Sequence, residues 1–136
     1  MKHDRIEIIK YHIKESRLNL HDAEDLAKKG SYNGSLNRAY YSIYHSAKAL
    51  LEFKGVETKS HSGVLAMFND HYVRTEEFSH TFFITFQKSE ILRTKADYAD
   101  LYEGTDDQAK HQIDGARLFL EESIRYLEKK LKTVLD

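Results

Sequence analysis

Apolar residues recur at steps of three and four along most of this 136-residue chain, which is the spacing of one face of an α-helix. The first such pattern covers about residues 4–28 and ends at Gly30. A second, over about residues 31–54, is the most apolar and aromatic long run in the chain. A third begins near residue 76 or 80 and continues into the late nineties, and the last follows a capping box at residues 105–108. The sequence therefore predicts four long helices.

A shorter helix is expected between the second and third of these patterns. Thr58 or Ser60 can cap its start, and its apolar residues continue to about His71. The turn at Gly30 is very short, so the first two helices should be antiparallel neighbours. The chain has no Pro and only 6 Gly, which favours uninterrupted helices. The predicted fold is all-α: an antiparallel up-and-down bundle of four long helices plus one short helix, in a single domain over residues 1–136.

Each long helix has a row of residues that should face the core. In the helix over residues 31–54 the row is Leu36, Tyr40, Ile43, Ala47 and Leu50. In the last helix it is Ala109, Ile113, Ala116, Leu120, Ser123, Leu127, Leu131 and Val134. An aromatic line in the third long helix is interpreted as core, or as a dimer interface if one bundle cannot bury all of it; its members are Phe78, Phe82 and Phe86. Two histidines of the first helix, His12 and His21, lie off its row and are assigned to the surface.

Composition narrows the classes of protein to consider. Hydrophobic residues make up 40% and charged residues 32% of the chain, which is typical of a folded globular protein. A net charge of −1 argues against a protein that coats duplex nucleic acid, which would carry a basic surplus. The absence of Cys excludes disulfides and thiolate metal sites. Because no apolar segment has the form of a secretory signal or a membrane span, we expect a cytoplasmic protein without membrane association.

The most apolar helix also carries a polar stripe, which includes Arg38, Tyr41 and His45. Arg38 and His45 are seven residues apart and so lie nearly one above the other, with Tyr41 between them. One interpretation is a solvated face or a cation stacked on aromatic rings. The other is a polar groove at a helix junction or dimer interface, where Arg binds phosphate and His transfers protons near neutral pH.

Two further groups of residues could contribute to chemistry. Lys59 and His61 stand at the start of the short helix, where free N–H groups can hold an anion, although simple capping is the more common explanation of such a cluster. Arg93, Asp97 and Tyr98 lie near the end of the third long helix, and Arg93 and Asp97 have the spacing of an ion pair. If folding brings these groups and the polar stripe together, they form an anion site suited to phosphodiester chemistry. The sequence has no metal-binding motif and no glycine-rich phosphate loop, so we expect neither a metal nor a cofactor.

Three segments in this order, NRAYYSIYHSAKALLEFKG, KSHSG and LRTKADY, resemble the HEPN domain, and in particular its small stand-alone prokaryotic branch. The resemblance covers about residues 30–102 by motif. It implies a helical bundle that is often dimeric. Many members of the family are metal-independent ribonucleases that act as toxins, paired with a minimal nucleotidyltransferase as antitoxin. A homodimer, such a partner protein, and RNA or a nucleotide as ligand are therefore expected here.

The family's signature is an Arg followed after four to six residues by a His. By resemblance Arg93 takes the Arg position, but the His position falls on residues 98–100, none of which is His. The candidate catalytic set is Arg93, Tyr98 and His45, and the candidate phosphate-binding or nucleotide-binding set is Arg38, Tyr41, Lys59, His61 and Asp97. Three hypotheses follow. The first, favoured by the missing His, is a non-catalytic or weakly active module that binds phosphate and pairs with a nucleotidyltransferase. The others are a metal-independent ribonuclease toxin and a dimeric scaffold without a ligand.

Overall fold

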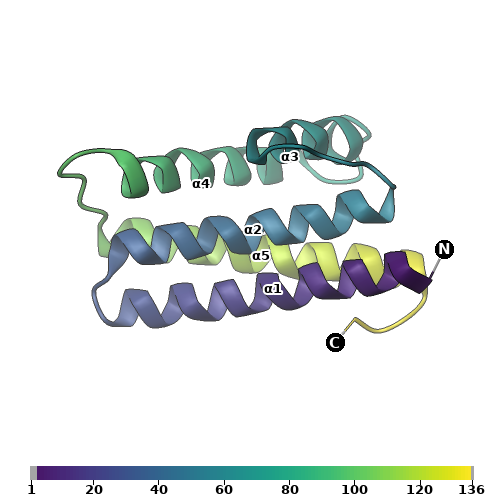
Figure 1. Cartoon of the computed structure of the whole chain (residues 1–136), viewed down its shortest axis with the longest axis horizontal. Coiled ribbons are helices and arrows are strands. Elements are labelled where there is room, and N and C mark those ends of the chain that lie inside the picture. Colours follow the sequence, from purple (N-terminus) through teal and green to yellow (C-terminus); the bar gives the residue numbers. More distant parts are fainter. Residues whose placement is uncertain (1–2, 136) are drawn as a thin grey trace.

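A computed structural model describes residues 3–135, and within them all regular secondary structure is helical. The elements in order are α1 (His3–Lys28), α2 (Tyr32–Phe53), α3 (His61–Phe68), the π-helical turn η1 (Asn69–Val73), α4 (His80–Tyr98) and α5 (Asp106–Leu131). Figure 1 shows the four long helices running along the bundle in alternating directions, with the short α3 beside α4. The predicted all-α bundle of four long helices and one short helix is confirmed.

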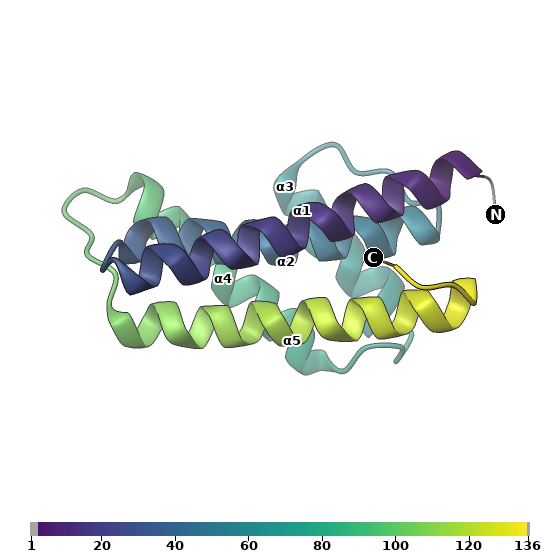
Figure 2. The same cartoon turned by 90° about the horizontal axis from the view of Figure 1, so that it is seen from below.

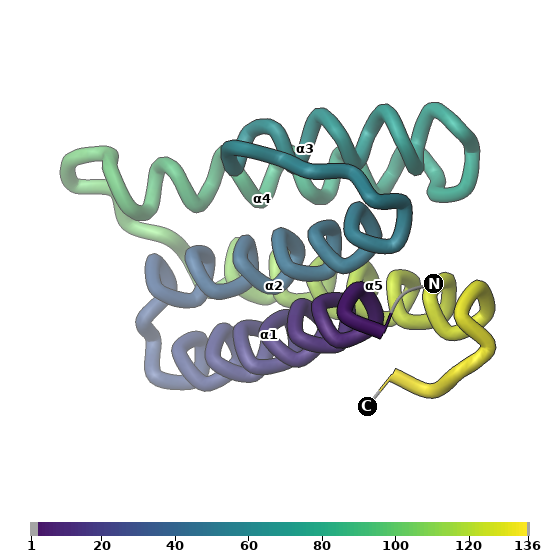
Figure 3. Tube along the Cα trace, turned by 45° about the vertical axis from the view of Figure 1, so that its right-hand side comes forward, coloured from purple at the N-terminus to yellow at the C-terminus, as the bar shows by residue number. Residues whose placement is uncertain are grey.

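Helix α2 lies at the centre of the bundle. It packs against α1, α3, α4 and α5, whereas α4 makes most of its helix contacts with α2. Figures 2 and 3 show the same arrangement from two other directions: α1 and α5 line one side of α2, and α3 and α4 cover the other. The predicted core row of α2, from Leu36 to Leu50, is fully buried. A polar residue on α2 therefore faces a neighbouring helix on almost any side.

Buried serines join α1 and α2 through hydrogen bonds. Ser16 of α1 donates to the carbonyl of Ser42 at 2.7 Å, and its hydroxyl also lies 2.8 Å from that of Ser46. Ser35 donates to the carbonyl of Ala23 at 2.8 Å, so the buried hydroxyls at this contact find partners across the two helices. Since these bonds join specific positions, they fix the register of α1 against α2.

The aromatic line of the sequence is part of the core. Phe86 is fully buried in α4, Phe78 is buried just before α4 begins, and Phe82 is partly buried. They surround Phe68 and Phe119, with ring centroids 5.0 Å apart for the Phe68–Phe119 pair. A single chain thus accommodates the whole aromatic line.

The helix ends agree with the sequence in part. The capping box that opens α5 is present, with Thr105 and Gln108 each accepting from the other's backbone N–H. Ser60, and not Thr58, caps α3 by accepting from the N–H of Gly63. The helix predicted to reach His71 ends as an α-helix at Phe68 and continues as the wider turn η1.

Val134 was predicted to face the core and does not: it is 65% exposed. Helix α5 ends at Leu131, and Lys132 adopts a left-handed conformation with φ of 55°, which redirects the chain. Leu135 is buried instead, and Arg17 donates to its carbonyl at 2.9 Å. Because α5 ends before Val134, the helical spacing of Val134 in the sequence does not predict where its side chain points.

Candidate functional site

Arg93 occupies the contact between α4 and α2. Its guanidinium lies 4.7 Å from the centroid of the Tyr40 ring, 5.7 Å from that of Tyr41 and 5.9 Å from that of Tyr98. Only 11% of its side chain is exposed. Stacking on aromatic faces is typical of Arg, because its planar guanidinium is weakly hydrated. The arginine that the sequence selected is therefore held against α2 by the two adjacent tyrosines of that helix.

A chain of polar contacts connects Arg93 to Arg38. A carboxylate oxygen of Asp97 lies 3.6 Å from Arg93 Nη1, and Asn37 donates to the same oxygen at 2.8 Å. Arg38 in turn donates through Nε to the Asn37 amide oxygen at 2.8 Å, and it lies 5.2 Å from the centroid of the Tyr41 ring. Two guanidinium groups are thus connected through one carboxylate and one amide.

His61, at the start of α3, lies beside the same tyrosines. Its ring centroid is 4.6 Å from that of Tyr44 and 5.6 Å from that of Tyr41. Part of the His61 side chain is exposed, but partial loss of solvent beside the tyrosines and the positive charges of Arg93 and Lys48 lower its pKa below the ordinary value, against the opposing influence of Glu90. The imidazole is therefore neutral near pH 7 and can accept a proton.

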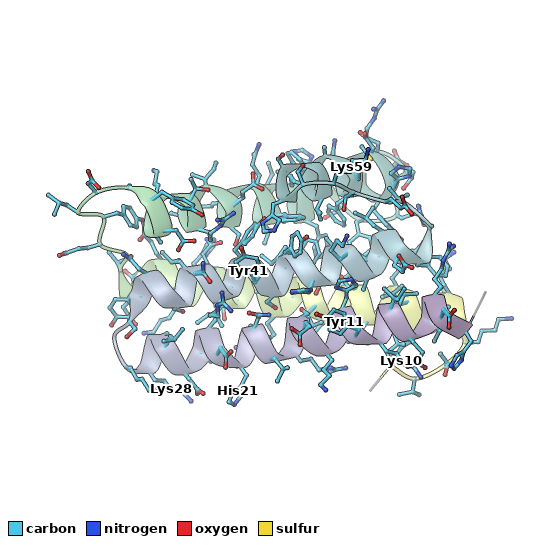
Figure 4. The ribbon with its side chains drawn as sticks, viewed as in Figure 1. Lys10, Tyr11, His21, Lys28, Tyr41 and Lys59 are labelled. Carbon is cyan, nitrogen blue, oxygen red and sulfur yellow. The ribbon has the colours of Figure 1, made fainter. Side chains whose placement is uncertain are left out.

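We refer to these side chains as the arginine–tyrosine cluster; its members are Arg38, Tyr40, Tyr41, Tyr44, His61, Arg93 and Asp97, with Asn37 as their connecting residue. Figure 4 shows Tyr41 on α2 in the middle of this face of the bundle. Burial raises the pKa of Tyr40 and of Tyr44, so both phenols remain protonated and act only as hydrogen-bond donors or neutral acceptors. The chemistry that this set offers is the binding of an anion, with one neutral imidazole beside it.

His45 lies toward α1 instead of stacking over Arg38. Its Nδ1 is 3.0 Å from Nδ1 of His12, and the two rings are stacked with centroids 5.2 Å apart. The assignment of His12 to the surface was wrong: it is half-buried between α1 and α2, whereas His21 is exposed as predicted. His45 still touches the cluster through the edge of Tyr44, 5.3 Å away.

Two predicted residues contribute less. Lys59 is exposed in the loop before α3, and Figure 4 shows it on the side of α3 away from α1. Within residues 3–135 it makes no hydrogen bond or ion pair. Tyr98 is 73% exposed at the last position of α4. It therefore marks the open edge of the cluster and does not belong to its packed part.

The described residues include no group of three or more His, Asp or Glu side chains arranged to hold a metal ion. The same part of the chain also contains no helix that is both long and apolar enough to cross a bilayer.

Comparison with known proteins shows which family this chain belongs to. The model of the HEPN domain matches residues 9–129, which include every element from most of α1 to nearly all of α5. The chain belongs to the HEPN domain family. The resemblance read from the motifs is thereby confirmed.

Relatives of this HEPN-domain protein occur in several organisms. A "UPF0332 protein" of Thermotoga maritima is 31% identical over 92% of this chain and 95% of its own length. Two proteins of Methanocaldococcus jannaschii are also similar. "Putative toxin MJ0605" is 36% identical over 86% of this chain and 84% of its own, and "Putative toxin MJ0142" is 30% identical over 85% and 78%. The relatives of this HEPN protein thus include proteins that are named as toxins.

Sequence reasoning missed several members of the site in this HEPN protein. Tyr40 was assigned only to the core, and Asn37 and Tyr44 were given no role. Tyr40 and Tyr44 are four residues apart on α2, so their side chains lie on one face, and this spacing could have indicated a shared partner. No local signal indicates that Asn37 joins Arg38 to Asp97, which is sixty residues away in the sequence.

Proposed function

We propose that this HEPN-domain protein is a toxin-type module whose arginine–tyrosine cluster binds the phosphate groups of RNA or of a nucleotide. The observation that carries the proposal is the polar connection of Arg93 to Arg38: the Asp97 carboxylate pairs with Arg93 and accepts from Asn37, and the Asn37 amide oxygen accepts from Arg38. Guanidinium groups recognise phosphate through paired N–H donors, and tyrosine rings beside them offer faces on which bases can stack. A phosphate that replaces Asp97 would lie against Arg93 and beside Asn37, the residue to which Arg38 donates.

Binding is tested with a fluorescently labelled single-stranded RNA, by anisotropy in EDTA at low salt. Arg93→Ala should weaken binding by roughly 10-fold or more, because a charge-assisted hydrogen bond is worth about 1.5–3 kcal/mol. Arg125→Ala is the control, since Arg125 is an exposed arginine of α5 that pairs with Glu122 and lies outside the arginine–tyrosine cluster. Equal affinities of the wild-type protein and Arg93→Ala would contradict the proposal. Competition by AMP or by inorganic phosphate then distinguishes a nucleotide site from one that needs the RNA chain.

A ribonuclease activity is the second candidate, and one observation favours it. His61 lies beside Tyr41 and Tyr44 in the field of Arg93, and its lowered pKa keeps it neutral near pH 7, as a general base requires. His61 is a better candidate for this role than Tyr98, whose side chain is a phenol at the open edge. Cleavage of a labelled RNA pool in EDTA that disappears in both Arg93→Ala and His61→Ala would establish this activity. Tight binding without cleavage would leave the protein as a binding module.

The partners expected from the family resemblance remain proposals. We propose a homodimer, for which the exposed Ile84 and Ile91 of α4 and Leu118 of α5 offer apolar surface. We also propose a minimal nucleotidyltransferase as the protein partner. The loop after α4 suits such an interaction, because it projects from the end of the bundle in Figure 1 and presents Leu101, 98% exposed, among acidic residues. Light scattering with Ile84→Glu tests the dimer. Co-purification with a co-expressed nucleotidyltransferase, compared for wild type and Leu101→Asp, tests the partner.

A further inference from the structure

Three buried polar atoms of the described chain have no hydrogen-bond partner: the hydroxyl of Tyr40, the hydroxyl of Ser89 and Nε of Arg93. Tyr40 has no exposed surface and Ser89 has 1%. Other buried hydroxyls of the bundle are satisfied; for example, Ser123 donates to the carbonyl of Phe119 at 2.7 Å, and Tyr72 donates to that of Leu50. Buried polar atoms without a hydrogen-bond partner are therefore confined to a few residues of the described chain.

These three atoms belong to one place, the contact between α2 and α4. Phe86, Ser89 and Arg93 are spaced by three and four residues, so they lie on the same face of α4. The Tyr40 ring touches the two outer members of this row, with its centroid 6.2 Å from that of Phe86 and 4.7 Å from the Arg93 guanidinium. Ser89 lies between them along this face of α4 and is buried. The Tyr40 hydroxyl and the Arg93 guanidinium are close enough for each to shift the pKa of the other, yet neither that hydroxyl nor Arg93 Nε has a partner in hydrogen-bond geometry.

Packing alone does not explain why these hydroxyls are present. A buried polar group without a partner loses its bonds to water and gains none, so each of them lowers the stability of the fold. Phe in place of Tyr40 and Ala in place of Ser89 would fill nearly the same space without that cost. Unsatisfied groups that persist in a native structure are expected where function uses them.

We propose that Tyr40 and Ser89 are ligand-binding residues whose hydroxyls, together with Nε of Arg93, hydrogen-bond a phosphate oxygen of the ligand. This inference rests on the proposed function and deepens it, because it adds two buried donors behind the arginines. Arg93 covers the Tyr40 ring, so the two hydroxyls become accessible when the guanidinium moves toward a bound phosphate. Both hydroxyls can donate, and donors are what an oxyanion requires.

The experiment compares orphan hydroxyls with matched, satisfied ones in the full-length protein. Tyr40→Phe is paired with Tyr72→Phe, and Ser89→Ala with Ser123→Ala; in each pair both residues are buried, and only the second has a hydrogen-bond partner. Each variant is measured by thermal unfolding and by binding of the labelled single-stranded RNA, with inorganic phosphate as competitor. Arg93→Ala is included to test the proposed function separately.

We expect opposite signs in the two measurements. Tyr40→Phe and Ser89→Ala should keep the wild-type Tm or raise it by about 2–5 °C, since they remove an unsatisfied group. The same variants should weaken RNA binding roughly 5-fold to 10-fold, as the loss of one hydrogen bond predicts. Tyr72→Phe and Ser123→Ala should lower Tm and leave RNA binding unchanged. A purely structural role for Tyr40 cannot produce this combination.

Three results would overturn the inference, and they are distinguishable. If Tyr40→Phe lowers Tm as Tyr72→Phe does, its hydroxyl is structural. If Arg93→Ala loses RNA binding while Tyr40→Phe and Ser89→Ala bind like wild type, the phosphate site stands but the two hydroxyls are not part of it. If the wild-type protein binds neither RNA nor phosphate, the proposed function fails and this inference fails with it.

Discussion

The pair formed by His12 and His45 should make the stability of this protein depend on pH. Burial, followed by the neighbouring His45 and Lys48, lowers the pKa of His12 from its ordinary value of 6.5 to about 4. Burial also lowers the pKa of His45, against the attraction of Glu15, with Lys48, His61 and Arg38 contributing in the same direction as burial. The geometry agrees, because the Nδ1 atoms lie 3.0 Å apart and can share one proton but not two.

The sign follows from which state binds more protons. Between pH 6.5 and about 4 the unfolded chain protonates His12 while the folded chain does not, so protonation favours unfolding. The stabilisation is complete above pH 6.5 and is lost as the pH falls toward 4. At about 1.4 kcal/mol per pH unit, this sets an upper limit of roughly 2 kcal/mol lost by pH 5.0. Partial exposure of the ring to solvent reduces the expected value to about 1 kcal/mol.

The assay is urea unfolding at pH 7.5 and pH 5.0 for three proteins: wild type, His12→Gln and His21→Gln. The wild-type free energy of unfolding should fall by about 1 kcal/mol more than that of His12→Gln over this interval. His21→Gln is the matched control, because His21 is on the same helix but exposed, and it should behave like wild type. A decrease in His12→Gln as large as in wild type would refute the reasoning.

Three other changes have expected outcomes. Phe68→Ala removes a fully buried ring from the centre of the aromatic core and should lower the free energy of unfolding by about 3–5 kcal/mol. Urea unfolding measures this loss, and a loss under about 1 kcal/mol would contradict the packing described. Burial opposes ionisation of Glu77, but hydrogen bonds from Lys54, Tyr126 and Thr75 outweigh it and lower its pKa to about 2. Wild type should therefore lose stability between pH 4.5 and 2 that Glu77→Gln does not lose, and parallel acid unfolding curves would argue against this network. Leu101→Gly should leave the free energy of unfolding unchanged or raise it by about 0.5–1 kcal/mol, because Leu101 is almost fully exposed and has a φ of 60°, which glycine adopts without strain. A lower Tm of the variant would show that the leucine side chain makes a contact in the folded state.

Local patterns in the sequence were enough to predict most of the fold. The core row of α2 from Leu36 to Leu50 follows from helical periodicity, which requires only that one face be buried. The capping box at Thr105 and the positive φ of Gly30 are likewise decided within four or five residues. Where the prediction was wrong, as at Val134, the chain had left the helix and the periodicity no longer described side-chain direction.

Less of the candidate site than of the fold could be predicted from the sequence. The sequence by itself selected Arg38, Tyr41, His61 and Arg93 as residues with chemical capacity. Only the tertiary structure decided which partners they have, because each contact depends on the register between helices that are far apart in the sequence. Asn37 reaches Asp97 across the α2–α4 contact, and His45 pairs with His12 across the α1–α2 contact. That register is set by buried small and aromatic side chains such as Ser16 and Phe86, whose packing partners no local rule predicts.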